Sequence, residues 1–308
     1  MLTFTISKIL TLKMGFNLSN QLKKMNIAIS GANGFIGKQL TYYFQAKQNN
    51  VRSISRIDEN TAVEGIMRQL ADADVVINLA GAPIVSRWTR KYKQTLFDSR
   101  ITSTCKIVEA ISMMDKKPEL LISASAVGIY SSVGNQTESN YQVAEDFLGK
   151  ICTAWEMEAK KAVPFSRVAI TRFGIVLGKD GGAFKKMLPL FRYGLGGKIA
   201  SGMQGFSWIH VYDVIHAIEF IIENPKLSGE FNLTAPGVID NSGFTKVLAK
   251  VLGKPALFAV PAFALKLLYG EGSIAVAGGQ FALPKHLLDE GFHFSYPDLK
   301  SALDDLTS

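Results

Sequence analysis

Three glycines near the start of the chain, Gly31, Gly34 and Gly37, recur at every third position. In a turn of this kind the first glycine allows a tight bend, the second lets the backbone approach a pyrophosphate, and the third lets a helix lie close on the preceding strand. The helix would point its free backbone N–H groups at the phosphates. The expected contacts of the turn with a dinucleotide involve Gly31, Asn33, Gly34, Phe35, Ile36 and Gly37.

A strand before this turn and a helix after it must hold the glycines in place. The run MNIAIS ends at Gly31 and is apolar, as expected of a strand buried on both faces of a parallel sheet. Ile36, Leu40 and Phe44 follow at helical spacing. A glycine triplet alone is weak evidence, because many such turns bind nothing, but the strand–turn–helix context indicates a dinucleotide site.

The end of the second expected strand, residues 51–56, should meet the ribose of the dinucleotide. It falls about twenty residues beyond the glycine turn, where an acidic residue would bind the ribose 2′-hydroxyl of NAD. Ser55 and Arg56 stand there instead, and a hydroxyl with a guanidinium suits the 2′-phosphate of NADP. The alternative is that Arg56 is a solvated charge and Asp58 binds the ribose.

Strands and helices alternate along the rest of the chain, which predicts an α/β fold with a Rossmann-type doubly wound parallel sheet. The segment between Arg56 and Ala71 leaves little room for both a full helix and a strand. The next apolar strand ends in residues that let a cofactor pass close to the backbone, and these are Leu79, Ala80 and Gly81. Further strands are expected at 120–123 and 168–171, and helices at 101–112 and 147–162.

This pattern divides the chain into an NADP-binding Rossmann domain at residues 25–225 and a small, mostly helical C-terminal lobe on the substrate side at residues 226–308. Residues 1–24 are interpreted as an extension, either disordered or an overcalled start, because Met25 directly precedes the first strand. A glycine-rich segment after Leu177 is expected to be mobile over the site. Asp213 is a plausible N-cap of the helix that follows it.

The composition, with 308 residues and 47% hydrophobic content, is that of an ordinary globular protein. Its two cysteines lie far apart and its four histidines lack metal-ligand spacing, so we predict no metal and a reducing, cytoplasmic location. Four lysines in the acid-free N-terminal segment contribute to the net charge of +8, and the remaining body is only mildly basic. We therefore expect neither nucleic acid nor a membrane as a partner.

Several blocks in order along the chain resemble the extended short-chain dehydrogenase/reductase superfamily: the glycine turn, NLAG, a serine on the fourth strand and WIHV with a following Asp. RFGIVLG, GLGGKIASG and GFHFSYP narrow the resemblance to an atypical epimerase-like group with its own C-terminal domain, sometimes labelled cell-division-inhibitor-like. The resemblance covers Met25 to nearly the C-terminus. It implies an NADP site to which Arg100 contributes from the next helix and Val176 from the nicotinamide side.

Typical members of that superfamily act through Ser, Tyr and Lys, where Lys lowers the pKa of the proton-transferring Tyr and Ser orients the substrate. The resemblance places Ser125 at the serine position, but it places Leu148 at the Tyr position and Cys152 at the Lys position. Neither can replace the usual residue. The Tyr-x-x-x-Lys pattern at Tyr43 and Lys47 is interpreted as coincidence, since it follows the glycine turn and lies far from the hydride face.

Two functions remain open from the sequence. The first is an NADP-dependent oxidoreductase or epimerase that acts on a small carbonyl or sugar-like substrate, with Ser125 as a catalytic residue and an unassigned proton donor. The second is a non-catalytic NADP-binding redox sensor or partner-docking protein. The fold does not decide between them.

Overall fold

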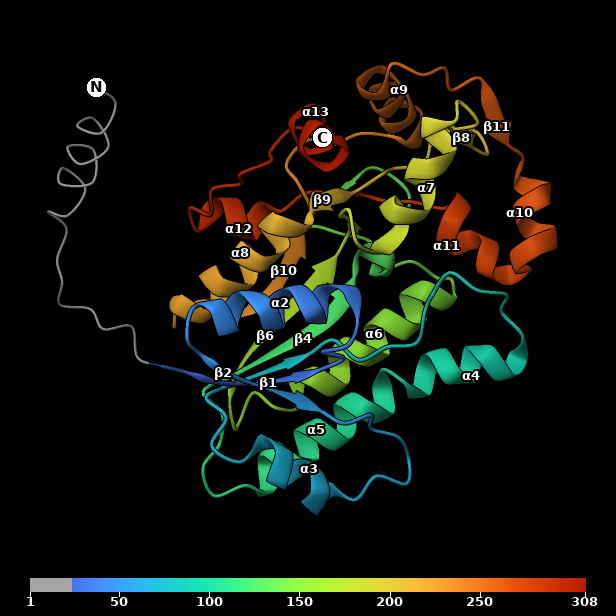
Figure 1. The fold of residues 1–308 in the computed structure, drawn as a ribbon. Coiled ribbons are helices and arrows are strands. Elements are labelled where there is room, and N and C mark those ends of the chain that lie inside the picture. Colours follow the sequence, from blue (N-terminus) through green and yellow to red (C-terminus); the bar gives the residue numbers. More distant parts are fainter. Residues whose placement is uncertain (1–23) are drawn as a thin grey trace, which may run out of the picture.

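Six parallel strands form the central sheet, in the order β10-β6-β4-β3-β1-β2 (Figure 1). The computed structural model describes residues 24–308, so most of the expected extension at 1–24 lies outside the described residues. The strands are β1 (Asn26–Ser30), β2 (Asn50–Ile54), β3 (Val75–Asn78), β4 (Leu120–Ala126), β6 (Arg167–Phe173) and β10 (Gly229–Leu233). The predicted α/β fold with a doubly wound parallel sheet is confirmed.

Helices cover both faces of this sheet, which explains why its central strands are apolar on both sides. In β1, Ile27, Ala28 and Ile29 are all fully buried. One face carries α2 (Phe35–Ala46) and α8 (Val211–Glu223). The other carries α3 (Val63–Leu70), α5 (Ile101–Met113) and α6 (Phe147–Lys160), while α4 (Arg90–Asp98) precedes α5.

The strand order reverses at β1, since β2 pairs with one side of it and β3 with the other. Ligands of open α/β sheets bind outside the carboxyl ends of the strands at such a switch point. Between β2 and β3 the chain forms only the eight-residue helix α3. The expectation that this segment has no room for both a full helix and a strand is therefore confirmed.

A second apolar core lies beyond the sheet. It joins α7 (Gly182–Arg192), α9 (Asn241–Leu252) and α13 (Leu299–Thr307). The expected boundary near residue 225 stays a prediction, but β10 beyond it completes the sheet and α7 before it packs with α9.

The remaining elements are short: β5 (Asn135–Gln136), β7 (Ile175–Leu177), β8 (Gly197–Ile199), β9 (Trp208–His210), β11 (Phe258–Val260), α10 (Ala262–Tyr269), α11 (Ile274–Ala277), β12 (Phe281–Ala282) and α12 (Lys285–Asp289).

Asp213 differs from its expected role as an N-cap. His210 occupies the N-cap of α8 and accepts a hydrogen bond from the backbone N–H of Tyr212. Asp213 lies buried in the first turn, where its carboxylate accepts hydrogen bonds from the backbone N–H groups of Ser295 and Tyr296 at 2.8 and 3.0 Å. Asp213 therefore fixes the C-terminal segment to the helix instead of capping it, a contact across more than eighty residues of chain.

Candidate functional site

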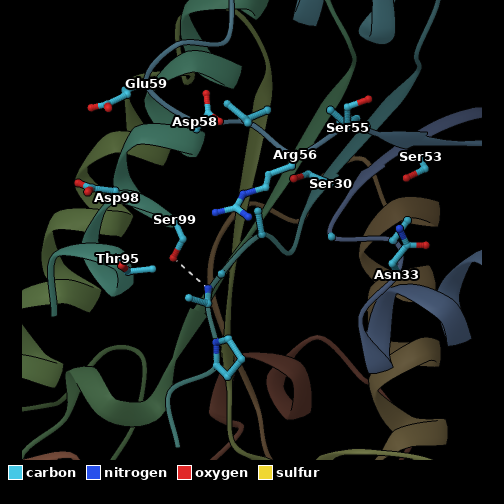
Figure 2. A pocket seen from close by; sticks show the side chains of 18 of the residues that line it. Ser30, Asn33, Ser53, Ser55, Arg56, Asp58, Glu59, Thr95, Asp98 and Ser99 are labelled. Atoms are coloured by element: carbon cyan, nitrogen blue, oxygen red, sulfur yellow. Dashed lines mark hydrogen bonds between the residues drawn. The ribbon is translucent and has the colours of Figure 1, made fainter. Parts of the chain in front are cut away.

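A cavity of about 570 Å³ opens at the carboxyl ends of β1 and β2, beside the switch point. Figure 2 shows its polar side chains. Of the residues predicted to bind the cofactor, six line it: Gly31, Asn33, Ser55, Arg56, Ala80 and Gly81. Polar residues that the sequence did not single out line it as well, and these are Ser30, Ser53, Glu59, Asn60, Thr95, Asp98 and Ser99.

The glycine turn forms one wall of the cavity and cannot carry side chains. Gly31 has a φ of +77°, and a Cβ there would lie 2.9 Å from the carbonyl carbon and oxygen of Leu79. A Cβ on Gly37 would lie 2.3 Å from the carbonyl oxygen of Gly31, so the turn and α2 touch directly. Gly34 is the N-cap of α2 without a side-chain hydrogen bond, and the first turn of the helix holds no acid. These uncapped N–H groups suit an anion such as a pyrophosphate.

Arg56 brings a positive charge into the cavity from the end of β2. Its side chain reaches toward Asp98 and Ser99 on the opposite wall (Figure 2), and within residues 24–308 it forms neither an ion pair nor a hydrogen bond. Asp58 is already engaged, because its carboxylate accepts hydrogen bonds from the backbone N–H of Asn60 and from the hydroxyl of Thr61. Both residues line the cavity; Arg56 has no partner among the described residues, whereas one carboxylate oxygen of Asp58 is bonded within its own loop.

The residues that follow β3 form the opposite wall of the cavity, and Arg100 supports this wall through a hydrogen bond. The Arg100 guanidinium donates to the backbone oxygen of Ala82 at 2.9 Å, and a Cβ on Gly81 would lie 3.1 Å from its central carbon. Burial lowers the pKa of Arg100. The hydroxyl of Ser99 accepts a hydrogen bond from the N–H of Ala82 at 2.9 Å, drawn as the dashed line in Figure 2. Arg100 thus supports the wall beside Gly81.

Asn78, a residue that sequence reasoning passed over, anchors the end of β3. It is fully buried, and its side-chain amide donates to the Thr104 hydroxyl at 2.8 Å. The same hydroxyl accepts a hydrogen bond from the Trp155 indole at 2.9 Å. The signal that could have found it is the NLAG block, whose first residue is Asn78.

Phe35 and Val176 lie on the far side of the glycine turn. The Phe35 ring packs under the glycine-rich segment, where a Cβ on Gly178 or Gly181 would lie 2.4 or 2.3 Å from it. Val176 is buried in β7, and its carbonyl oxygen lies 3.0 Å from where a Cβ of Gly182 would sit. These glycines let the glycine-rich segment after Leu177 lie close on Phe35. The expected mobility of this segment stays a prediction.

Ser125 ends in a buried polar network instead of an open pocket. Its hydroxyl donates to Glu156 Oε1 at 2.7 Å. The same carboxylate accepts two hydrogen bonds from Arg172, at 2.8 and 2.7 Å. Arg172 also donates to the Tyr130 hydroxyl at 2.8 Å, which donates in turn to Asn232 at 2.6 Å. The Ser125 hydroxyl also interacts with the Cys152 thiol, so the side chain lies inside this network with its proton directed at Glu156.

The residues at the usual Tyr and Lys positions are apolar or uncharged. Leu148 and Cys152 pack on the short helical turn at Gly128. Cys152 is buried, and its burial raises the pKa of the thiol to about 12. Tyr130 is fully buried, and burial also raises the pKa of its phenol. None of these three groups is poised to exchange a proton at neutral pH.

Tyr43 and Lys47 are explained without catalysis. Both side chains contact the Glu219 carboxylate of α8, the Tyr43 hydroxyl at 2.5 Å. The pair ties α2 to α8 on the outer face of the sheet, which agrees with the interpretation of this pattern as coincidence. No group of three metal-ligating side chains able to hold an ion occurs within residues 24–308.

The reversing parallel sheet, the glycine turn and the cavity at the switch point define a Rossmann-like α/β protein. Within that class, the chain belongs to the NAD dependent epimerase/dehydratase family, whose profile matches residues 27–234. Residues 260–306 match a domain of unknown function, DUF1731. This combination confirms the resemblance to an epimerase-like group with its own C-terminal domain.

Relatives with this combination are similar to the chain over nearly its whole length. An epimerase family protein of Staphylococcus haemolyticus is 38% identical over 291 residues, covering 90% of this chain and 97% of the relative. The chloroplastic SDR39U1 homolog of Arabidopsis thaliana is 37% identical, covering 92% and 87%. The crystal structure of human epimerase family protein SDR39U1 with NADPH superposes with a TM-score of 0.85 at 29% identity, covering 92% of this chain and 99% of that one.

Proposed function

We propose that this protein is an NADP-dependent oxidoreductase or epimerase that acts on a small carbonyl or sugar-like substrate. The observation that carries the proposal is the unpaired Arg56 side chain in a cavity that is also lined by the glycine turn, where Gly31 leaves the backbone uncovered. The related human protein crystallised with NADPH supports the choice of cofactor. Bound there, NADPH would supply a hydride to the substrate.

The chain's own residues have separate tasks in this proposal. The uncapped N-terminus of α2 binds the pyrophosphate, and Arg56 binds the 2′-phosphate. Arg100 keeps the wall at Gly81 in place. Ser125, whose own proton is donated to Glu156, accepts a hydrogen bond from a hydroxyl group of the substrate and so orients it. The C-terminal lobe shapes the substrate side.

The second candidate, a non-catalytic NADP-binding sensor or docking protein, is favoured by one observation. Leu148 and Cys152 replace the usual proton-transfer pair, and the Tyr130 hydroxyl is already bonded to Asn232. Oxidation of NADPH across a panel of carbonyl compounds and nucleotide sugars would support the enzyme. Ligand-dependent binding of a partner without turnover would support the sensor.

We further propose a cytoplasmic location and no nucleic-acid partner. Cys105 and Cys152 are both free thiols, which suits a reducing compartment. No helix within residues 24–308 has the length and apolar character needed to cross a membrane.

The proposed cofactor preference predicts that NADPH binds at least about tenfold more tightly than NADH, since one charge-assisted contact with the phosphate contributes about 1.5 kcal/mol or more. Arg56→Ala should remove most of this difference while leaving NADH affinity unchanged. Titration calorimetry with both cofactors measures it. Arg52→Ala, a change of an arginine on the same strand outside the cavity lining, is the control. Equal affinities of the unmodified protein for the two cofactors would contradict the role of Arg56.

Ser125→Ala should reduce turnover by about a hundredfold, in the range that positioned polar groups contribute to proton-transfer steps. It should leave NADPH affinity nearly unchanged, because Glu156 keeps its two hydrogen bonds from Arg172. Cys152→Ala, one turn away from Glu156 on α6, should change neither turnover nor affinity by more than about twofold. If Cys152→Ala abolished turnover and Ser125→Ala did not, the thiol would be the reacting group and the assignment of Ser125 would be wrong.

A further inference from the structure

Large apolar side chains are exposed together on one side of the C-terminal lobe. They come from the end of α7 and from the stretch of β11 and α10. Leu257, Phe263 and Leu267 are 86%, 75% and 74% exposed, and Tyr193, Phe258 and Leu268 are exposed as well. We call these six residues the apolar face. Contiguous exposure on this scale marks an interaction surface in a folded protein.

The two segments that carry the apolar face lie side by side. Strand β8, just after α7, pairs with β11, and a Cβ on Gly194 would contact the Pro255 ring at 3.5 Å. Figure 1 shows α7, β8, β11 and α10 together at the edge of the molecule farthest from β2. Only Leu265 of α10 is buried, Ala264 and Tyr269 are half-buried, and the other five residues of this helix are exposed in the described chain.

The surroundings of the apolar face are strongly basic. Residues 182–212 and 241–270 contain eight lysines and arginines and no aspartate or glutamate. All eight are exposed, and none forms an ion pair within the described residues; they are Lys185, Lys186, Arg192, Lys198, Lys246, Lys250, Lys254 and Lys266.

Several nearby acids are engaged elsewhere. Glu271, which follows α10, pairs with Lys93. On α13, Asp304 pairs with Lys300 and Asp305 contacts His210. Asp180 and Asp240 lie just before the two basic segments, but neither forms an ion pair with any of the eight cations within residues 24–308.

We propose that the apolar face docks on the surface of an anionic phospholipid bilayer. Exposed leucines and phenylalanines can enter the headgroup region while lysines meet the lipid phosphates. A second copy fits poorly, since the contact would set eight unpaired cations against eight others. A nucleic acid would neutralise the lysines but leave the apolar side chains in water. Our expectation of no membrane partner rested on the mildly basic character of the body of the chain and on the lack of a spanning segment. A surface contact needs no spanning segment, and it depends on where the cations lie and not on the net charge.

Sedimentation with lipid vesicles tests this proposal on the full chain. The protein should bind vesicles of phosphatidylcholine containing phosphatidylglycerol at least about tenfold more tightly than vesicles of phosphatidylcholine alone, and high salt should weaken this binding. Phe263→Glu combined with Leu267→Glu should reduce it at least about tenfold. Lys254→Gln combined with Lys266→Gln should reduce only the preference for the anionic vesicles.

The matched control is Met157→Glu combined with Val163→Glu, since both residues are 62% exposed and lie outside the apolar face. It should bind vesicles as the unmodified protein does, and circular dichroism should show that each variant is folded. Absence of binding to anionic vesicles would overturn the proposal. So would equal loss of binding in the control variant, or a concentration-dependent dimer, without vesicle binding, that Phe263→Glu and Leu267→Glu dissociate.

Discussion

Glu156→Gln should lower the free energy of unfolding by about 3–5 kcal/mol, because it leaves the buried Arg172 guanidinium without its counter-charge. Both side chains are almost completely buried, and Arg172 donates two hydrogen bonds to the carboxylate. In the native chain burial by itself lowers the pKa of Arg172, but the hydrogen bonds and charge of Glu156 raise it. Without Glu156 the guanidinium stays charged because arginine does not lose its proton near neutral pH, even when it is buried. Urea denaturation followed by circular dichroism measures the loss.

The control for this prediction is Glu158→Gln, the same substitution two residues along α6. Glu158 is half-buried, but its partner Lys161 is exposed and well solvated, and such pairs contribute about 1 kcal/mol or less. Replacing both partners by apolar residues, as in Glu156→Leu with Arg172→Met, should recover part of the lost stability, since no buried charge then remains. Equal decreases in the free energy of unfolding in Glu156→Gln and Glu158→Gln would show that the buried pair stabilises the protein no more than the pair of Glu158 and Lys161.

Gly37→Ala should weaken NADPH binding by about a thousandfold, or about 4 kcal/mol. The added Cβ would lie 2.3 Å from the carbonyl oxygen of Gly31 and 2.7 Å from the Cα of Ala32, and both are backbone atoms that cannot rotate away. The helix must therefore move off the turn. Displacing its N-terminus loses two or more charge-assisted hydrogen bonds to the phosphates, each of about 1.5–3 kcal/mol.

Titration calorimetry with NADPH measures this effect, and a thermal melt without cofactor separates it from unfolding. Gly65→Ala is the matched control, because Gly65 lies in α3 and the nearest atom to its Cβ is the end of the Arg68 side chain at 3.9 Å. It should keep the affinity and leave stability the same or slightly higher, as expected for alanine in a helix. Unchanged NADPH affinity in Gly37→Ala would contradict the placement of the pyrophosphate at this turn.

Close spacing in the sequence explains why the cofactor cavity could be anticipated. Gly31, Gly34 and Gly37 act within one turn, so their spacing already fixes the backbone. Arg56 was predictable because the end of a second parallel strand must lie beside the end of the first. The two-sided burial of β1 and the alternation of strands and helices followed in the same way from short-range patterns of hydrophobicity.

The other wall of the cavity was less accessible to prediction. Thr95, Asp98 and Ser99 belong to or follow α4, a polar helix that buries only Leu96, and the alternation of elements gave no reason to expect it. Ser99 acts on Ala82 across seventeen residues of chain. Such a contact depends on how a helix packs on the strand end, and no short sequence pattern predicts a contact between residues so far apart in the chain.

The sheet, the glycine turn and the position of Arg56 after β2 follow from neighbouring residues, because these act through backbone conformation and hydrophobic period. The direction of the Ser125 hydroxyl toward Glu156, the contact of Asp213 with the C-terminal segment and the exposure of Phe263 and Leu267 on α10 became known from the fold alone. Side-chain direction and burial depend on packing between elements far apart in the chain, so each of these outcomes required the folded molecule.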